Sequence, residues 1–268
     1  MKIAKVLAAS LLTCVFLLSL FPQLITGDAS DEQFRNDINL APGPRYLLGT
    51  DDLGRNRLTR LLSGTRTSLF LAPIAALASV IAAALVGIVA GNGGSLVNRL
   101  FEAIADFTAS MPWLLLLVAL RALLPLDAPP LTATAITFTL LAFLGWPGAA
   151  RIIRNAVQEL KTREFALQAR ALGVGGWRFS MIHLAPNIVA VAAAQFWINL
   201  PVFILTEANL GLLGMGVPEP YASLGNQLRD LQSLQSVTEN PTLLAPAVLL
   251  TLVVSSLWII SIREERYL

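Results

Sequence analysis

Long apolar runs recur along the chain, each close to the length of one membrane crossing. About 30 Å of hydrocarbon, at 1.5 Å of helix rise per residue, requires about 20 residues. Residues 6–25, 68–91, 131–150, 188–206 and 243–262 meet this length without a charged residue. A further run, 107–120, reaches it only by including Glu102, Asp106 or Arg121. The pattern predicts an all-α integral membrane protein with about six transmembrane helices.

The composition supports this class. Of 268 residues, 55% are hydrophobic and only 13% are charged, a balance too apolar for a soluble globular surface. The basic residues are scattered and not gathered into a patch, so we expect no nucleic-acid partner. The run 6–25 follows Lys2 and Lys5 and could also be a secretory signal. It is long enough to span, however, and no small-x-small cleavage site follows it, so an uncleaved first span is predicted.

The placement of Lys and Arg predicts the orientation, because these residues accumulate in short cytoplasmic loops. The loop 151–187 holds six basic residues against Glu159 and Glu164, whereas segment 207–241 holds one arginine against four acids. The basic loop is therefore expected inside, with both termini on the cytoplasmic side of the cell inner (plasma) membrane. Segment 26–67 carries six arginines and six acids, and this balance gives it little weight in the assignment.

The loop 151–187 is long for a connector and carries its own helical pattern. Residues 158–172 predict an amphipathic helix, and Gly173 is of the type common just past a helix end. Segment 164–173, followed by Pro186, resembles the cytoplasmic signature loop of the permease subunits of bacterial ABC importers.

That family pattern is Glu-Ala-Ala, three residues, Gly, and a later proline. Ala169, Gly173 and Pro186 fit the spacing, while Leu167 and Gln168 stand in place of the leading Glu-Ala. The resemblance implies a coupling site for a cytoplasmic ATPase at Glu164, Ala169, Arg170, Gly173 and Pro186. Because Leu167 replaces the acid, we expect docking to depend more on apolar contact and on Arg170.

Two other stretches narrow the resemblance to the dipeptide, oligopeptide and nickel branch, as its second permease. Residues 48–69 closely resemble the stretch before that permease's second span, and residues 207–226 resemble the one after its fifth. Asp106 and Pro112 also lie where the family's third span has them. The resemblance implies a type I importer permease fold, with an N-terminal helix and periplasmic segment (1–67) and a permease domain (68–268).

The resemblance also implies the partners: a sister permease, two cytoplasmic ABC ATPases, a periplasmic or lipid-anchored substrate-binding protein, and membrane lipid. No cofactor or enzymatic activity is expected, and the chain has no Gly-rich phosphate loop with its lysine. Peptides are the favoured solute, and a nickel chelate stays open. Candidate pathway or mouth residues are Asp106, Asn199 and Glu207, of which Glu207 is expected to face the periplasmic mouth.

Other interpretations compete with this one. An intramembrane enzyme would need a nucleophile and base, or a metal site, at bilayer depth, and the predicted spans contain no histidine. A stand-alone carrier or channel does not require the basic loop. His183 alone cannot form a metal site, so a structural role is expected. Asp51 and Asp52 resemble part of an acidic metal pair, but Arg55 and Arg57 stand close enough to neutralise them, which favours turn and capping roles.

Overall fold

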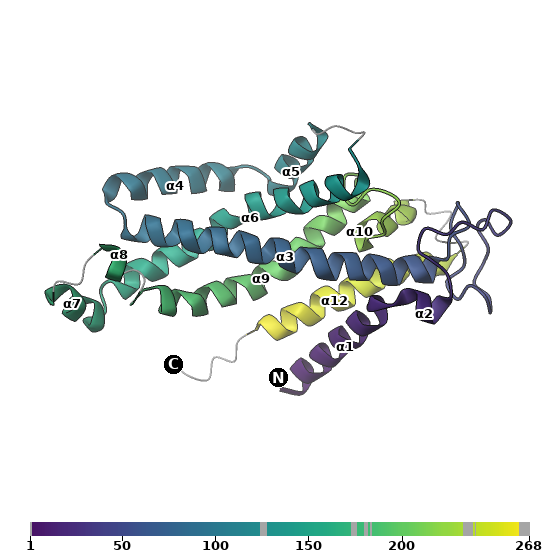
Figure 1. Ribbon diagram of the computed structural model, residues 1–268, viewed down its shortest axis with the longest axis horizontal. Coiled ribbons are helices and arrows are strands. Elements are labelled where there is room, and N and C mark those ends of the chain that lie inside the picture. The colour runs from purple at the N-terminus through teal and green to yellow at the C-terminus, as the bar shows by residue number, and fades with distance from the viewer. Residues whose placement is uncertain are drawn as a thin grey trace. The chain divides into compact units, whose positions relative to one another are not determined.

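The computed structural model describes residues 2–123, 128–172, 176–179, 182, 184–232, 238 and 240–262, and the regular elements within these ranges are helices (Figure 1). In chain order they are α1 (Lys2–Leu20), α2 (Pro22–Thr26), α3 (Arg57–Asn92), α4 (Ser95–Ser110), α5 (Trp113–Ala122), α6 (Pro130–Leu160), α7 (Glu164–Ala171), α8 (Gly176–Phe179), α9 (Ala185–Leu212), α10 (Leu224–Gln227), η2 (Leu228–Gln232), η3 (Pro241–Leu244) and α12 (Ala245–Ser261).

The helices confirm the all-α membrane class. Within the described residues, five helices are long and apolar enough to cross a bilayer: α1, α3, α6, α9 and the continuous η3–α12 segment. The predicted third span is instead a bent pair, in which α4 and α5 meet at 84°. Pro112 explains the break, because the residue before a proline is driven out of the helical region, and Met111 has φ −89° and ψ 134°.

Proline also shortens the first predicted span. α1 ends at Leu20, and Pro22 starts the short helix α2, which closes at Gly27 with a positive φ of 79°. Other helices are longer than predicted: α3 has 36 residues and α6 has 31. At 1.5 Å per residue these lengths are roughly 54 and 46 Å, more than the hydrocarbon thickness. Parts of both helices therefore extend beyond the apolar layer.

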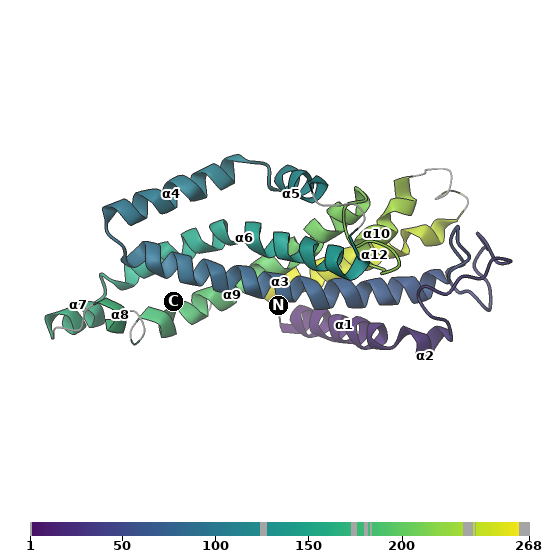
Figure 2. The ribbon, with the colours of Figure 1, turned by 45° about the horizontal axis from the view of Figure 1, so that its top comes forward.

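The chain forms two compact units, and each is described by itself. The first unit comprises Met1–Pro73, Arg121–Phe138 and Leu200–Leu268. In it α1 and α12 lie side by side (Figures 1 and 2), and the Lys5 ammonium donates to the Ile262 carbonyl. Segment 27–56 is irregular, apart from one antiparallel bridge between Thr50 and Asn56.

The second unit comprises Ile74–Leu120 and Thr139–Asn199. Its core is built largely from small side chains, which allow helix backbones to approach closely. At Gly91 of α3, an added Cβ would lie 2.7 Å from Val157 of α6. The buried core residues are Ala83, Ala90, Phe101, Ala105, Ala149, Ala150, Ile153, Val157, Ala166, Ala169, Phe179, Leu184 and Ile188.

Candidate functional site

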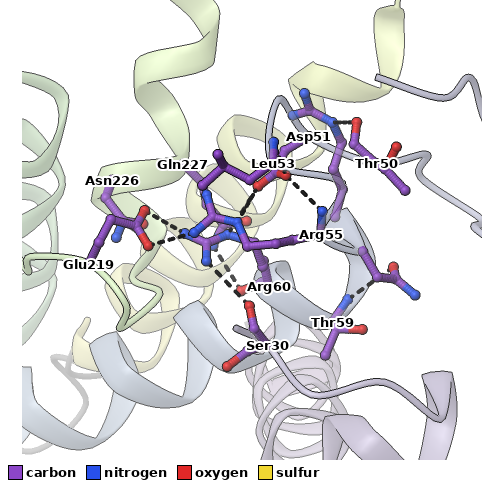
Figure 3. Close-up of polar contacts among 12 residues, drawn as sticks. Ser30, Thr50, Asp51, Leu53, Arg55, Thr59, Arg60, Glu219, Asn226 and Gln227 are labelled. Atoms are coloured by element: carbon purple, nitrogen blue, oxygen red, sulfur yellow. Dashed lines mark hydrogen bonds and ion pairs between the residues drawn. The ribbon is translucent and has the colours of Figure 1, made fainter. Parts of the chain in front are cut away.

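Asp51 organises the turn that precedes α3. Its Oδ1 accepts hydrogen bonds from the backbone N–H of Leu53 at 3.0 Å and of Arg55 at 2.8 Å. Its Oδ2 pairs with Arg55 Nε at 2.7 Å, and both side chains are buried (Figure 3). The turn role predicted for Asp51 is confirmed. Within the described ranges, no three His, Cys, Asp or Glu residues are grouped as they would be to hold a metal ion.

Two arginines extend this turn to a distant part of the chain. Arg55 Nη1 and Arg60 Nη2 each lie 2.8 Å from a carboxylate oxygen of Glu219, and Arg60 Nε is 3.8 Å from Asp51. We call Asp51, Arg55, Arg60 and Glu219 the arginine network (Figure 3). Burial alone would lower the pKa of Arg55, but hydrogen bonds and charges from Asp51 and Glu219 outweigh it and raise the pKa. The guanidinium therefore stays charged.

Beneath the network, the start of α10 packs against α3 and α9. Gln227 Nε2 donates to the Arg60 and Ser223 carbonyls, each at 3.0 Å. Ser68 Oγ accepts from the Leu224 N–H at 3.2 Å and donates to Glu207 Oε2 at 2.9 Å. One hydroxyl thus links three segments.

Glycine makes this packing possible. A Cβ at Gly211 would lie 2.3 Å from the backbone of Gly225, and a Cβ at Gly225 would lie 2.8 Å from the Glu207 carbonyl. No side chain fits at either position without movement of the backbone. Glu207 itself has no exposed surface. The sequence predicts that Glu207 faces an open periplasmic mouth. In the structure the carboxylate is covered instead, because segment 223–227 approaches it closely.

The loop 151–187 differs from prediction at its first helix. α6 continues to Leu160, and residues 161–163 form a turn before α7, so the single helix predicted over 158–172 is wrong. The Lys161 N–H still donates to the Val157 carbonyl at 3.1 Å, as in a helix, and its Nζ donates to the Gly91 carbonyl at 3.0 Å. This contact fixes the turn against the end of α3.

α7 inserts its alanines into the core of the second unit. Ala166 is fully buried and Ala169 is 7% exposed, and both belong to the core formed with α3, α4, α6 and α9. On the other side, Glu164 is exposed, Phe165 is 37% exposed and Leu172 beyond the helix is 83% exposed. The helix thus has one face packed on the long helices and one face open.

Two of the predicted coupling-site residues lie wholly or partly outside the described part of the chain, and a third, Pro186, lies at the start of a helix. Gly173 and the side chain of Arg170 lie outside the described part of the chain. Pro186 is the second residue of α9, where proline is tolerated because the N–H that it lacks would have no partner in the first helical turn.

A polar ladder joins α4 to α6, which run side by side in the second unit (Figure 2). Asp106 pairs with Arg151 at 2.6 Å. Arg154 pairs with Glu102 at 2.7 Å and donates to Asn98 Oδ1 at 2.6 Å. Glu102 and Asp106 flank the predicted third span, but the sequence alone did not identify Arg154 and Arg151 as their partners. The spacing of four residues from 98 to 102 to 106, which places all three on one helix face, was the available signal.

The three predicted pathway residues are not brought together by any described interaction. Asp106 has a 72% exposed side chain. Asn199 has a buried Nδ2 with no hydrogen-bond partner among the described residues. Both belong to the second unit, whereas Glu207 belongs to the first.

Comparisons with known proteins agree with the architecture. Residues 83–267 match the family model described as the binding-protein-dependent transport system inner membrane component. The chain is 30% identical over 220 residues to the dipeptide transport system permease protein DppC of Bacillus subtilis, covering 82% of this chain and 67% of that protein. It is 31% identical to the DppC of Alkalihalophilus pseudofirmus, covering 91% and 78%.

An oligopeptide relative is also similar. The oligopeptide transport system permease protein OppC of Bacillus subtilis is 33% identical over 189 residues, which are 70% of this chain and 60% of that protein. The chain therefore spans between three fifths and four fifths of the length of these relatives.

Proposed function

Because the chain belongs to the family of binding-protein-dependent transport system inner membrane components, we propose that it forms half of the translocation pathway of an ATP-driven peptide importer. A nickel chelate is the other solute that the sequence leaves open. The relatives named above as dipeptide and oligopeptide permeases support the peptide assignment.

We propose a full set of partners for this subunit: a sister permease, two cytoplasmic ATPases, and a periplasmic or lipid-anchored binding protein. In this arrangement both termini and loop 151–187 are cytoplasmic, and segment 27–56 is periplasmic. The exposed apolar side chains of the long helices, such as Phe70 at 59% and Phe143 at 68%, would face lipid or the sister permease.

The packing of α7 is the observation that carries the coupling role. A helix that docks on an ATPase must transmit displacement, and α7 buries Ala166 and Ala169 in one close-packed core with the long helices. Close-packed interiors transmit strain instead of absorbing it. The exposed Phe165 and Leu172 supply apolar contact for docking, as the replacement of the family's glutamate by Leu167 suggests. Arg170 and Gly173 complete the proposed coupling site.

We assign a pathway role to Asp106 and Asn199. Asp106 is a charged residue on a predicted span, and such residues face water or protein instead of lipid. Its exposed carboxylate is already paired with Arg151, which lowers the cost of a charge near the apolar layer. Asn199 would use its unpaired amide in the same path.

The test is purification in mild detergent followed by reconstitution. We expect the sister permease and two ATPases to co-purify, and loaded binding protein to stimulate ATP hydrolysis. Gly173→Val should abolish this stimulation while the complex still assembles, because the sequence predicts a left-handed turn at Gly173, in which a β-branched residue would be strained by about 1 to 3 kcal/mol.

A matched control is available at Gly94, the residue before α4. Its φ is −71° and a Cβ there would meet nothing within 4 Å, so Gly94→Val should keep full stimulation. Full stimulation in Gly173→Val would contradict the proposed coupling role of Gly173. A chain that transports peptides as a lone monomer would contradict the proposed function as a whole.

A further inference from the structure

A polar cavity of about 700 Å³ lies beside the arginine network, and its lining residues all belong to the first unit. Its volume is within the range of about 300 to 1,000 Å³ typical of small-molecule sites. The charged lining residues are Asp52, Arg57, Arg229 and Asp230, two of each sign. The family comparison and the coupling role leave this cavity without an assigned ligand.

Two of the four charges neutralise each other. Arg57 Nη1 lies 2.5 Å from Asp230 Oδ2, and Arg57 Nε donates to the Thr50 carbonyl at 2.8 Å. Asp52 and Arg229 are both exposed and take part in no ion pair among the described residues. The cavity therefore presents one carboxylate and one guanidinium that are available to a ligand.

Hydrogen bonds hold the cavity walls in place. The Leu40 N–H donates to Thr50 Oγ at 2.8 Å, and the Asn39 N–H donates to the Asp51 carbonyl at 3.0 Å. Thr242 Oγ donates to the Leu48 carbonyl at 3.2 Å. These bonds join segment 27–56 to the start of η3, and the Arg57–Asp230 ion pair joins the start of α3 to η2, which carries Arg229.

We propose that this cavity binds the free main chain of a short, unblocked peptide. The α-ammonium would pair with Asp52 and the α-carboxylate with Arg229, whose planar guanidinium matches a carboxylate in two-pronged geometry. The side-chain amides of Asn39, Gln232 and Asn240 also line the cavity. Gln232 Nε2 already donates to the Leu212 carbonyl, and Asn240 Oδ1 already accepts from Thr242. The groups offered to a peptide bond are therefore Gln232 Oε1, Asn240 Nδ2 and the Asn39 amide. The choice of peptide rests on the proposed function.

Such a site would recognise a peptide by its two termini and not by its side chains. The lining supports this, because the described charges and amides match groups that every unblocked short peptide carries. The cavity would then hold peptide at the outer end of the subunit, separately from the binding protein.

The experiment uses the purified transporter in lipid nanodiscs without binding protein, with dialanine, N-acetyl-dialanine and dialanine amide as probes. Binding is measured by titration calorimetry or saturation-transfer NMR. We expect dialanine to bind at least tenfold more tightly than either blocked form. Asp52→Asn should weaken the binding of dialanine and dialanine amide but leave N-acetyl-dialanine unchanged. Arg229→Gln should weaken the binding of dialanine and N-acetyl-dialanine but leave dialanine amide unchanged.

Asp31→Asn and Arg35→Gln serve as controls, since both residues are exposed in segment 27–56 and neither lines the cavity. Equal binding of free and blocked peptides would overturn the inference, as would variants that alter only the recruitment of binding protein. ATP-driven uptake with the binding protein present tests the proposed function separately. If peptide uptake is observed but dialanine binding does not depend on free termini, only the cavity assignment is wrong. If dialanine binds in this way but no uptake is observed, only the proposed importer function is wrong.

Discussion

Gly87→Ala tests whether tight packing of α3 on α6 carries the coupling motion. A Cβ at Gly87 would lie 2.8 Å from the Ala150 carbonyl oxygen and 2.9 Å from Ile153 Cγ2. The carbonyl belongs to the α6 backbone and cannot rotate away, so the two helices must separate. Overpacking of this kind costs about 1 to 3 kcal/mol. The better helix propensity of alanine returns roughly 0.5 to 1 kcal/mol. The net loss lies between about 0 and 2.5 kcal/mol, with a central value of about 1 kcal/mol.

The separation should also reach α7. Ala150 and Ile153 belong to the same buried core as Ala166 and Ala169, so a displaced α6 changes the surface on which α7 rests. For the purified complex in detergent, we expect Tm to fall by about 2 to 6 °C. We also expect binding protein to stimulate ATP hydrolysis less strongly, although basal hydrolysis by the ATPases stays unchanged.

Gly148→Ala is the matched control, because Gly148 also lies within a helix, α6, and a Cβ there would meet nothing within 4 Å. Gly148→Ala should leave the stability unchanged or raise it by up to about 1 kcal/mol, so its Tm should stay constant or rise. An unchanged Tm in Gly87→Ala would refute the packing argument. A lowered Tm with full stimulation would show that the core stabilises the fold without transmitting the motion.

Three further predictions concern topology, ionisation and the buried carboxyl. Protease-cleavable tags at positions 30 and 235 should be accessible from the periplasm, and tags at positions 158 and 268 should be protected. Protection at position 30 would mean that the first apolar run does not cross the membrane. Burial and the hydrogen bond to Asp37 raise the pKa of Tyr46 from 10.0 to about 12. The contribution of neutral Tyr46 to stability should therefore be complete below pH 10.0 and lost as pH rises toward 12. Tyr46→Phe should remove this alkaline loss in a series of Tm measurements against pH, and a pH profile identical to that of the unaltered protein would contradict the prediction. Glu207→Ala should lower the stability by roughly 2 to 4 kcal/mol, because it leaves a void beside Ser68. Glu207→Gln, which nearly preserves the volume, should lower the stability less. Equal Tm values for the two variants and the unaltered complex would show that Glu207 is not a packing residue.

The length of the apolar runs was enough to predict five of the six spans as helices, because bilayer thickness sets that length whatever the tertiary contacts are, but it did not predict the 84° bend between α4 and α5. The local chemistry of Asp51 was also predictable, since its main partner, Arg55, is only four residues away. The turn at 161–163 was not predictable from amphipathic periodicity alone. That pattern continues through the turn, whereas the side-chain contact made at the turn joins Lys161 to a carbonyl 70 residues earlier.

The two stretches that carried the family resemblance illustrate the same limit. Residues 48–69 and 207–226 are about 150 positions apart, yet Arg55 and Arg60 reach Glu219, and Ser68 reaches Glu207. Neither stretch reveals this pairing, because ion-pair partners at such separation leave no periodic signal. The glycines give a partial indication after the fact: a helix residue without Cβ, such as Gly211, is destabilising unless something packs against it. Here the backbone of Gly225 fills that space, and the carboxylate of Glu207 is enclosed as a consequence.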